Sequence, residues 1–128
     1  MENNTYDRVT LILPAKSEYV STARLTVSSV ANRIGFNIDD VEDIKVAVSE
    51  VLNMILSRAG DKIDQYIILF EISSDKLEIT FTGHETELGC FNSEMENGYG
   101  LYIMKALMDS VELCNNNHSI VMTKKIGE

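Results

Sequence analysis

The chain lacks a long apolar run, since no stretch of about 18 apolar residues occurs anywhere in it. A membrane-spanning helix is therefore excluded by the sequence. The first ten residues, MENNTYDRVT, also lack the basic and then apolar pattern of a secretory signal. We therefore expect a cytoplasmic protein without a membrane partner.

Cysteine and histidine are also scarce. The two cysteines, Cys90 and Cys114, are far apart without a CxxC spacing, and the two histidines, His84 and His118, are isolated. Metal sites built from these residue types show closer spacings. We expect reduced, structural thiols, as is usual inside the cell, and no metal site made of these four residues.

Basic residues are few compared with acidic ones. Eleven Lys and Arg stand against 20 Asp and Glu, which gives a net charge of −9 at pH 7, and the isoelectric point is near 4.6. Direct binding of DNA or RNA needs a basic surface that neutralises phosphates, so nucleic acid is not an expected partner. An acidic surface instead suits docking on a basic protein surface.

The remaining composition is that of an ordinary globular protein. Of the 128 residues, 45% are hydrophobic and 24% are charged, which is typical of a chain that buries its own core. We find no internal repeat, linker or low-complexity segment. Residues 1–128 are therefore expected to form a single domain.

One stretch, residues 39–60, organises the rest of the chain. Its apolar residues recur at three- and four-residue steps, which is typical of one face of a helix: Ile44, Val48, Val51 and Ile55. Asp39 or Asp40 can cap its start and Gly60 can end it. A single carboxylate, Glu50, lies in the middle of this apolar stretch. It is either at the edge of the buried face or part of a functional site.

The other elements follow from the same kind of pattern. The sequence predicts strands at 6–13, 66–72, 77–82, 111–114 and 119–125, and helices at 17–34 and 98–109, with an irregular polar segment at 83–98. Helices gathered on one face of a mixed, mostly antiparallel sheet give an α+β fold, a two-layer α/β sandwich.

The chain contains, in this order, four segments that identify a family: LPAKSEYVSTARLTVSSVANRIGF, DDVEDIKVAVSEV, GYGLYIMKALMDSVEL and SIVMTKK. In these segments it resembles the anti-sigma-factor serine kinases, the RsbW and SpoIIAB type, of the GHKL ATPase superfamily. The resemblance implies the Bergerat, or histidine-kinase-like ATPase, fold. It also implies a protein that inhibits a sigma factor, exchanges it for an antagonist protein, and phosphorylates a serine of that antagonist with ATP and magnesium.

The first family motif pairs a general-base glutamate with a magnesium-binding asparagine four residues later. By resemblance Glu50 is the glutamate, but Met54 occupies the asparagine position and Asn53 lies one position early. Successive helical residues point about 100° apart, and a thioether is a poor ligand for magnesium. In an active enzyme, Glu50 would be the general base, and Asn53 would bind magnesium and nucleotide.

The two other motifs concern the nucleotide. The resemblance expects an Asp-x-Gly pair that binds adenine, but Gly83 and Glu85 occupy the two positions. Gly98, Gly100 and Leu101 match a Gly-x-Gly-Leu motif that approaches phosphates with backbone N–H groups. The same glycines would also serve a tight turn that has no nucleotide. The ATP-binding motifs are therefore degenerate.

Two main functions remain open at this stage, and a third alternative is that the vacated pocket binds a different small ligand. The first is an anti-sigma-factor-like regulatory protein that acts by partner switching, with ATP binding and kinase activity weakened or lost. The alternative is an active serine-protein kinase that uses ATP and magnesium and phosphorylates an anti-sigma-factor antagonist.

In both cases the resemblance implies a sigma factor or an antagonist as the partner, and a homodimer. It points to Arg24, Asn32 and Arg33 on the first helix as partner-binding residues. Ordinary solvated side chains are the alternative at these three positions.

Overall fold

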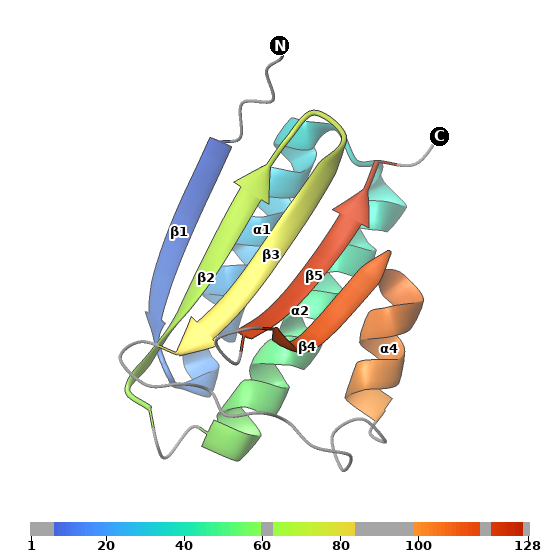
Figure 1. The fold of residues 1–128 in the computed structure, drawn as a ribbon. Helices are drawn as coiled ribbons and strands as arrows, with labels where there is room; N and C mark the ends of the chain where they lie inside the picture. The colour runs from blue at the N-terminus through green and yellow to red at the C-terminus, as the bar shows by residue number, and fades with distance from the viewer. Residues whose placement is uncertain (1–6, 60–62, 84–98, 116–118, 127–128) are drawn as a thin grey trace.

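The computed structural model describes residues 7–59, 63–83, 99–115 and 119–126. The expected helix stop at Gly60 and the segment after Gly83 fall outside these ranges. In chain order the elements are β1 (Asp7–Pro14), a 3-10 turn η1 (Ser17–Tyr19), α1 (Val20–Ile34), α2 (Ile38–Ala59), β2 (Gln65–Ile72), β3 (Lys76–Gly83), α4 (Tyr99–Leu107), β4 (Ser110–Asn115) and β5 (Ser119–Lys125) (Figure 1).

The five strands form one sheet in the order β1-β2-β3-β5-β4. All four neighbouring pairs are antiparallel, so the described part of the sheet is not mixed. The three helices α1, α2 and α4 lie together behind the sheet in Figure 1. The predicted two-layer α+β sandwich is therefore confirmed.

The core lies between the helices and the sheet, and α2 is at its centre. The four apolar residues that predicted this helix, Ile44, Val48, Val51 and Ile55, are all fully buried. The sheet meets them with the alternate residues of β2 and β3, of which Ile68, Phe70, Ile79 and Phe81 are also fully buried. The sequence patterns therefore identified the buried side of each element correctly, through alternate residues in the strands and three- and four-residue steps in α2.

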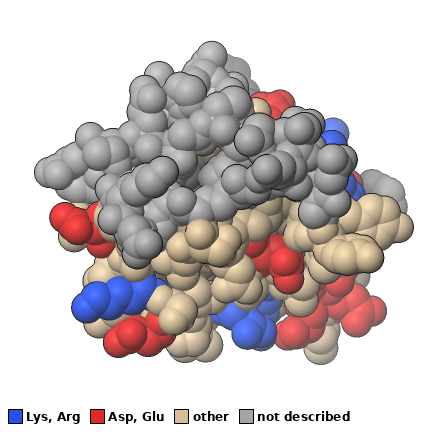
Figure 2. Space-filling view, turned by 90° about the horizontal axis from the view of Figure 1, so that it is seen from below, with Lys and Arg blue, Asp and Glu red and all other residues tan. Residues whose placement is uncertain are grey.

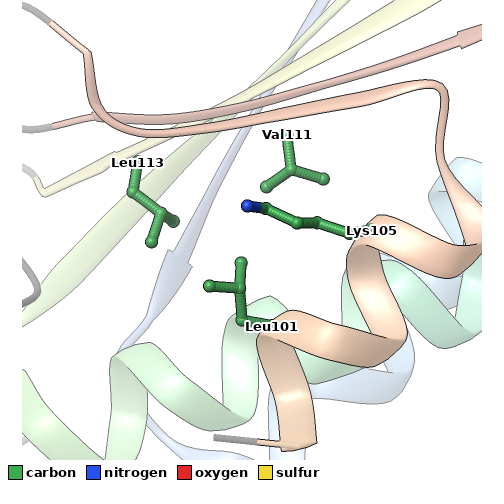
Figure 3. A pocket seen from close by; sticks show the side chains of 4 residues that line it. All are labelled: Leu101, Lys105, Val111 and Leu113. Carbon is green, nitrogen blue, oxygen red and sulfur yellow. The ribbon is translucent and has the colours of Figure 1, made fainter. Parts of the chain in front are cut away.

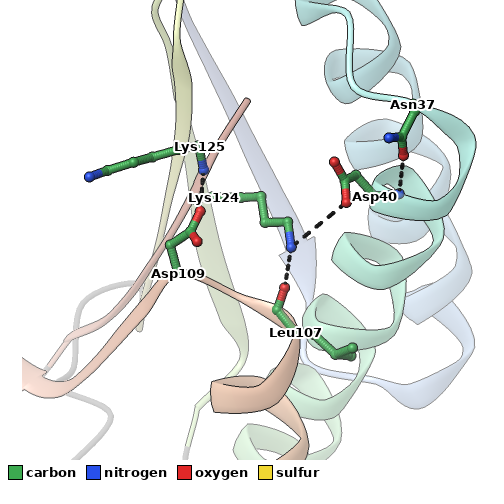
Figure 4. Close-up of polar contacts among 6 residues, drawn as sticks. All are labelled: Asn37, Asp40, Leu107, Asp109, Lys124 and Lys125. Carbon is green, nitrogen blue, oxygen red and sulfur yellow. Dashed lines mark hydrogen bonds and ion pairs between the residues drawn. The ribbon is translucent and has the colours of Figure 1, made fainter. Parts of the chain in front are cut away.

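The helix ends differ from the sequence prediction at two points. Ser17 does not cap α1, which starts at Val20 after the 3-10 turn η1. At α2, Asn37 is the cap in place of Asp39 or Asp40, because its Oδ1 accepts a hydrogen bond of 2.7 Å from the Asp40 N–H (Figure 4). The two aspartates lie inside the first turn, where the helix dipole favours negative charge.

The C-terminal end of α1 agrees with the prediction. Gly35 has φ 108° and its N–H donates to the Ala31 carbonyl, which is the left-handed termination that glycine permits. None of the helices in the described ranges has the length and apolar character needed to cross a membrane.

Candidate functional site

The candidate site lies where the first turn of α4 packs on α2. Glu50 and Met54 are one turn apart on α2 and face the same way. A methyl group placed on the Gly100 α-carbon would lie 3.2 Å from Glu50 Oε1 and 3.2 Å from Met54 Sδ. Gly100 therefore allows the α4 backbone to approach this pair of side chains closely.

Asn53 is not part of this contact. It is exposed on the surface of α2, whereas both Glu50 and Met54 are half-buried. A helix turns by about 100° per residue, so the adjacent positions 53 and 54 cannot face α4 together. The residue that meets Gly100 one turn after Glu50 is thus a thioether and not an amide.

Gly83, at the end of β3, lies beside a buried phenol. Its Cα is the strand partner of the Tyr66 Cα on β2. In the same register Phe81 is opposite Ile68, so all four positions belong to the helix-covered side of the sheet. Tyr66 is fully buried, and its hydroxyl has no hydrogen-bond partner among the described residues. Where the family resemblance expects an adenine-binding carboxylate, the structure therefore has a glycine, whose strand partner is a buried tyrosine.

The burial of Tyr66 leads to a prediction about alkaline pH. Burial raises the pKa of the Tyr66 phenol to about 12, whereas in an unfolded chain it is about 10. As the pH rises, the Tyr66 phenol therefore loses its proton at a lower pH in the unfolded state than in the folded state. The stability that is present below pH 10 is then lost as the pH rises to about 12. The shift corresponds to about 2 to 3 kcal/mol.

Urea denaturation of the wild type and of Tyr66→Phe at pH 8 and pH 11.5 would measure this effect. The difference between the two proteins at each pH is the quantity to compare, because effects of pH on the rest of the chain are common to both. We expect Tyr66→Phe to be neutral or stabilising at pH 8, because it removes an unpaired buried hydroxyl. It should lose less stability than the wild type at pH 11.5, and an equal loss would contradict the assignment.

The described residues around Gly100 do not match the ligand set of a magnesium–nucleotide complex. Magnesium takes hard oxygen ligands in octahedral geometry, but the described surroundings of Gly100 provide one carboxylate, Glu50, and one soft sulfur, Met54. No group of three or more His, Cys, Asp or Glu residues in the described ranges could hold a metal ion. Gly83 has no side chain to accept the adenine amino group. Glu85 and Gly98 lie outside the described residues.

Leu101, the last matched residue of the glycine motif, belongs mainly to the core. It is 4% exposed and lines a cavity of about 300 Å³ together with Lys105, Val111 and Leu113 (Figure 3). This cavity lies between α4 and β4. The Lys105 side chain extends into it between the apolar groups.

The three expected partner-binding residues, Arg24, Asn32 and Arg33, are all exposed on α1. Arg24 lines a hollow of about 270 Å³ with Ser21, Leu25 and Lys45. Leu25 is 71% exposed. The hollow thus combines two basic side chains with an exposed apolar one, and Lys45 comes from α2, which sequence spacing could not reveal.

Charges of both signs are distributed over the end of the molecule shown in Figure 2. Acidic and basic side chains alternate over the part of this surface that the structure describes. The view shows no continuous basic area among these residues. The net negative charge of the chain is therefore not offset by a basic surface in the described part of this end.

The C-terminal end of α4 is fixed by polar contacts that the sequence did not indicate (Figure 4). Lys124 Nζ donates to the carbonyl of Leu107, the last residue of α4, and lies 4.0 Å from Asp40 Oδ1 on α2. Asp109 accepts a hydrogen bond of 2.6 Å from the Lys125 N–H. These contacts hold α4 to β5 and α2, and so fix the helix that carries Gly100.

Replacing Lys124 with methionine should destabilise the protein by about 1 to 3 kcal/mol, because the Leu107 carbonyl and the Asp40 carboxylate lose a largely buried cation. Chemical denaturation at pH 7 measures this directly. Lys125→Met is the matched control, since Lys125 uses its backbone N–H in the contact and its side chain is exposed. Equal effects of the two substitutions would argue against a role of the Lys124 side chain.

The antiparallel sheet with α1, α2 and α4 on one side has the fold of a histidine kinase-like ATPase domain. A family model described as the histidine kinase-like ATPase domain matches residues 13–124. The chain belongs to this family.

Within it, the chain is similar to serine-protein kinases named RsbW. It is 37% identical over 141 residues to the RsbW of Listeria innocua, covering 96% of this chain and 90% of that protein. It is 33% identical over 138 residues to the RsbW of Bacillus cereus strain G9842, covering 94% and 86%. A crystal structure of the RsbU and RsbW domains of Rv1364c from Mycobacterium tuberculosis has the same fold, with a TM-score of 0.68 and 15% identity. That match covers 93% of this chain and 32% of the other.

Proposed function

We propose that this chain is an anti-sigma-factor-like regulatory protein that acts by partner switching, and that its ATP binding and kinase activity are weakened or lost. The observation that carries the proposal is the contact of Met54 with Gly100, at the place where the family resemblance expects a magnesium-binding amide. Gly83 supports it, because it has no side chain to accept the adenine amino group. Phosphoryl transfer depends almost entirely on positioning and electrostatics, so loss of a metal ligand is severe.

The partners under this proposal are a sigma factor and an antagonist protein in the cytoplasm. The Arg24 hollow supports this view, because Arg24 beside the exposed Leu25 suits an acidic and apolar segment of a partner, whereas Lys45 is paired with Glu42 at 3.2 Å. Asn32 and Arg33 are also exposed on α1 but do not line the hollow. We also propose that the protein is a homodimer.

The alternative, an active serine-protein kinase, has one observation in its favour. The Glu50 carboxylate remains half-buried beside the first turn of α4, where it could reach a substrate hydroxyl as a general base. Exposed Asn53 would then have to provide the metal ligand, which would require a shift of α2.

A thermal unfolding titration with ATP and magnesium separates the two functions. A ligand that binds only the native state raises the melting temperature, and binding at 100 times Kd contributes about 2.7 kcal/mol. We expect no magnesium-dependent shift at 5 mM ATP, a concentration of about the usual cellular order. A clear shift that Glu50→Ala or Asn53→Ala abolishes would refute the proposal in favour of the kinase.

The partner claim has its own test. Purified sigma factor or antagonist should bind the wild type, and Arg24→Glu should weaken binding at least tenfold in isothermal titration calorimetry. Lys125→Glu, an equal charge change at an exposed side chain of β5, is the control. Loss of binding in both variants would show a general charge effect and count against the Arg24 hollow.

A further inference from the structure

The cavity of about 300 Å³ between α4 and β4 lies at the edge of the sheet, where α4 covers the last strand only in part (Figure 3). Val111 of β4 pairs with Met122, which pairs with Ile79, so the three side chains share the helix-covered side. Met122 and Ile79 are fully buried, whereas Val111 is only half-buried. Space is therefore left between α4 and β4 that the core does not fill.

The side of α4 that faces the sheet has one residue that does not suit a core. Leu101, Met104 and Met108 are 4%, 0% and 6% exposed, and they follow the three- and four-residue steps of a buried helix face. Lys105 is four residues after Leu101, at a position that this pattern normally fills with an apolar side chain. The Lys105 side chain instead extends into the cavity, between Leu101 and the two half-buried residues of β4 (Figure 3).

The ammonium group of Lys105 gives the cavity a positive charge. Among the described residues, the cavity is lined by this cation and by the aliphatic side chains of Leu101, Val111 and Leu113, without a carboxylate. Glu112, which is next to Val111 in β4, belongs to the opposite face of the sheet. Lys105 is an exposed residue, so the cavity is open to solvent and a ligand can reach its ammonium group.

One cation among three aliphatic side chains suits a ligand that has a single negative charge and an apolar chain. A carboxylate would accept charge-assisted hydrogen bonds from the ammonium group, and an aliphatic chain would be removed from water against the leucine and valine side chains. A doubly charged anion such as phosphate fits less well. It would have a single cation as its partner in a chain whose net charge is −9.

The volume of the cavity limits the size of this ligand. Its 300 Å³ is at the lower end of the range of ligand pockets, which is about 300 to 1,000 Å³. Liquid water occupies about 30 Å³ per molecule, so the cavity has room for about ten non-hydrogen atoms. Octanoate, an unbranched aliphatic acid of about this size, is therefore a suitable probe.

We propose that this cavity binds a small aliphatic monocarboxylate, with the carboxylate on the Lys105 ammonium group and the chain against the three aliphatic side chains. The site goes beyond the proposed function and does not depend on it. It lies between α4 and β4, whereas the contact of Gly100 with Glu50 lies between α4 and α2. A ligand in the cavity would touch α4 and β4 together, and would so stabilise the position of the helix that carries Gly100.

Isothermal titration calorimetry of the purified chain with octanoate tests the proposal. We expect a dissociation constant on the order of 0.1 to 1 mM, as is reasonable for so small a ligand. In NMR spectra, octanoate should shift the methyl signals of Leu101, Val111 and Leu113. Octan-1-ol has the chain without the charge, and acetate has the charge without the chain, so both should bind at least about tenfold more weakly. Equal binding of either compound would overturn the assigned ligand class.

Substitutions at Lys105 test the role of its charge. Lys105→Met keeps the length of the side chain and should weaken octanoate binding at least about tenfold, whereas Lys105→Arg should stay within about threefold of the wild type. Lys105 is exposed, so the fold should survive both changes, and circular dichroism checks this. Lys125→Met, which removes an exposed lysine of β5, is the matched control and should bind octanoate like the wild type.

Three results would overturn the proposal. They are a wild type that does not bind octanoate at about 5 mM, a Lys105→Met variant that binds it as tightly as the wild type, and an equal loss of binding in Lys105→Met and Lys125→Met. The titration uses neither nucleotide nor partner protein. Its failure is therefore distinct from a failure of the proposed function.

Discussion

Combining Met54→Asn with Gly83→Asp is expected to give the protein a magnesium-dependent rise in melting temperature when ATP is added. Position 54 lies one turn after Glu50 and against Gly100, so an asparagine there would place a hard oxygen beside the carboxylate. An aspartate at 83 would supply a carboxylate next to Tyr66. At 100 times Kd, binding stabilises the native state by about 2.7 kcal/mol, or roughly 10 °C for a domain of this size.

The control variants separate geometry from chemistry. Met54→Leu keeps the side-chain volume at position 54 without adding an oxygen, so ATP and magnesium should not raise its melting temperature. Asn53→Ala, added to the double variant, should leave the response of that variant unchanged. Differential scanning fluorimetry with ATP, with and without magnesium, is sufficient. If the double variant folds but does not respond at 5 mM ATP, these two positions are not what limits binding.

Ile44→Ala should be among the most destabilising conservative substitutions in α2. Ile44 is fully buried at the centre of the core, and truncation of such a residue costs about 2 to 5 kcal/mol through lost burial and the cavity that remains. Small domains have only about 5 to 15 kcal/mol of stability. The variant should therefore show a strongly lowered midpoint in urea denaturation.

The same helix provides a matched control. Ile38 is 79% exposed at the first position of α2, so Ile38→Ala removes the same atoms without opening a cavity. It should change stability by less than about 0.5 kcal/mol. Similar losses in both variants would mean that burial is not what distinguishes the two sites.

The sequence predicted the elements well where a regular period was present. The three- and four-residue steps in α2 and the alternation in β2 and β3 identified the buried residues, because burial on one side of an element repeats with its geometry. Caps were predicted less well. Asn37 precedes two aspartates that are equally suited to capping by type, and only the backbone conformation decides among them.

For the candidate site, the sequence could predict that Met54 stands in place of the expected amide, because this follows from the position of Met54 along the helix. It could not predict Tyr66 or Lys124. The unpaired hydroxyl depends on what surrounds the ring in three dimensions, and the Lys124 contacts join residues 17 and 84 positions apart in the chain.

The topology of the sheet has a consequence for the order of folding. β2 and β3 are joined by a three-residue turn and β4 and β5 by a short connection, so both hairpins can form within microseconds. β1 has to pair with a strand about 50 residues away, as in Pro14↔Gln65, and such a long loop closes late because its entropy is paid before contacts form. We therefore expect β1 to join last. Until it does, β2 is an unprotected edge strand whose Ile67 and Leu69 are open to aggregation during refolding.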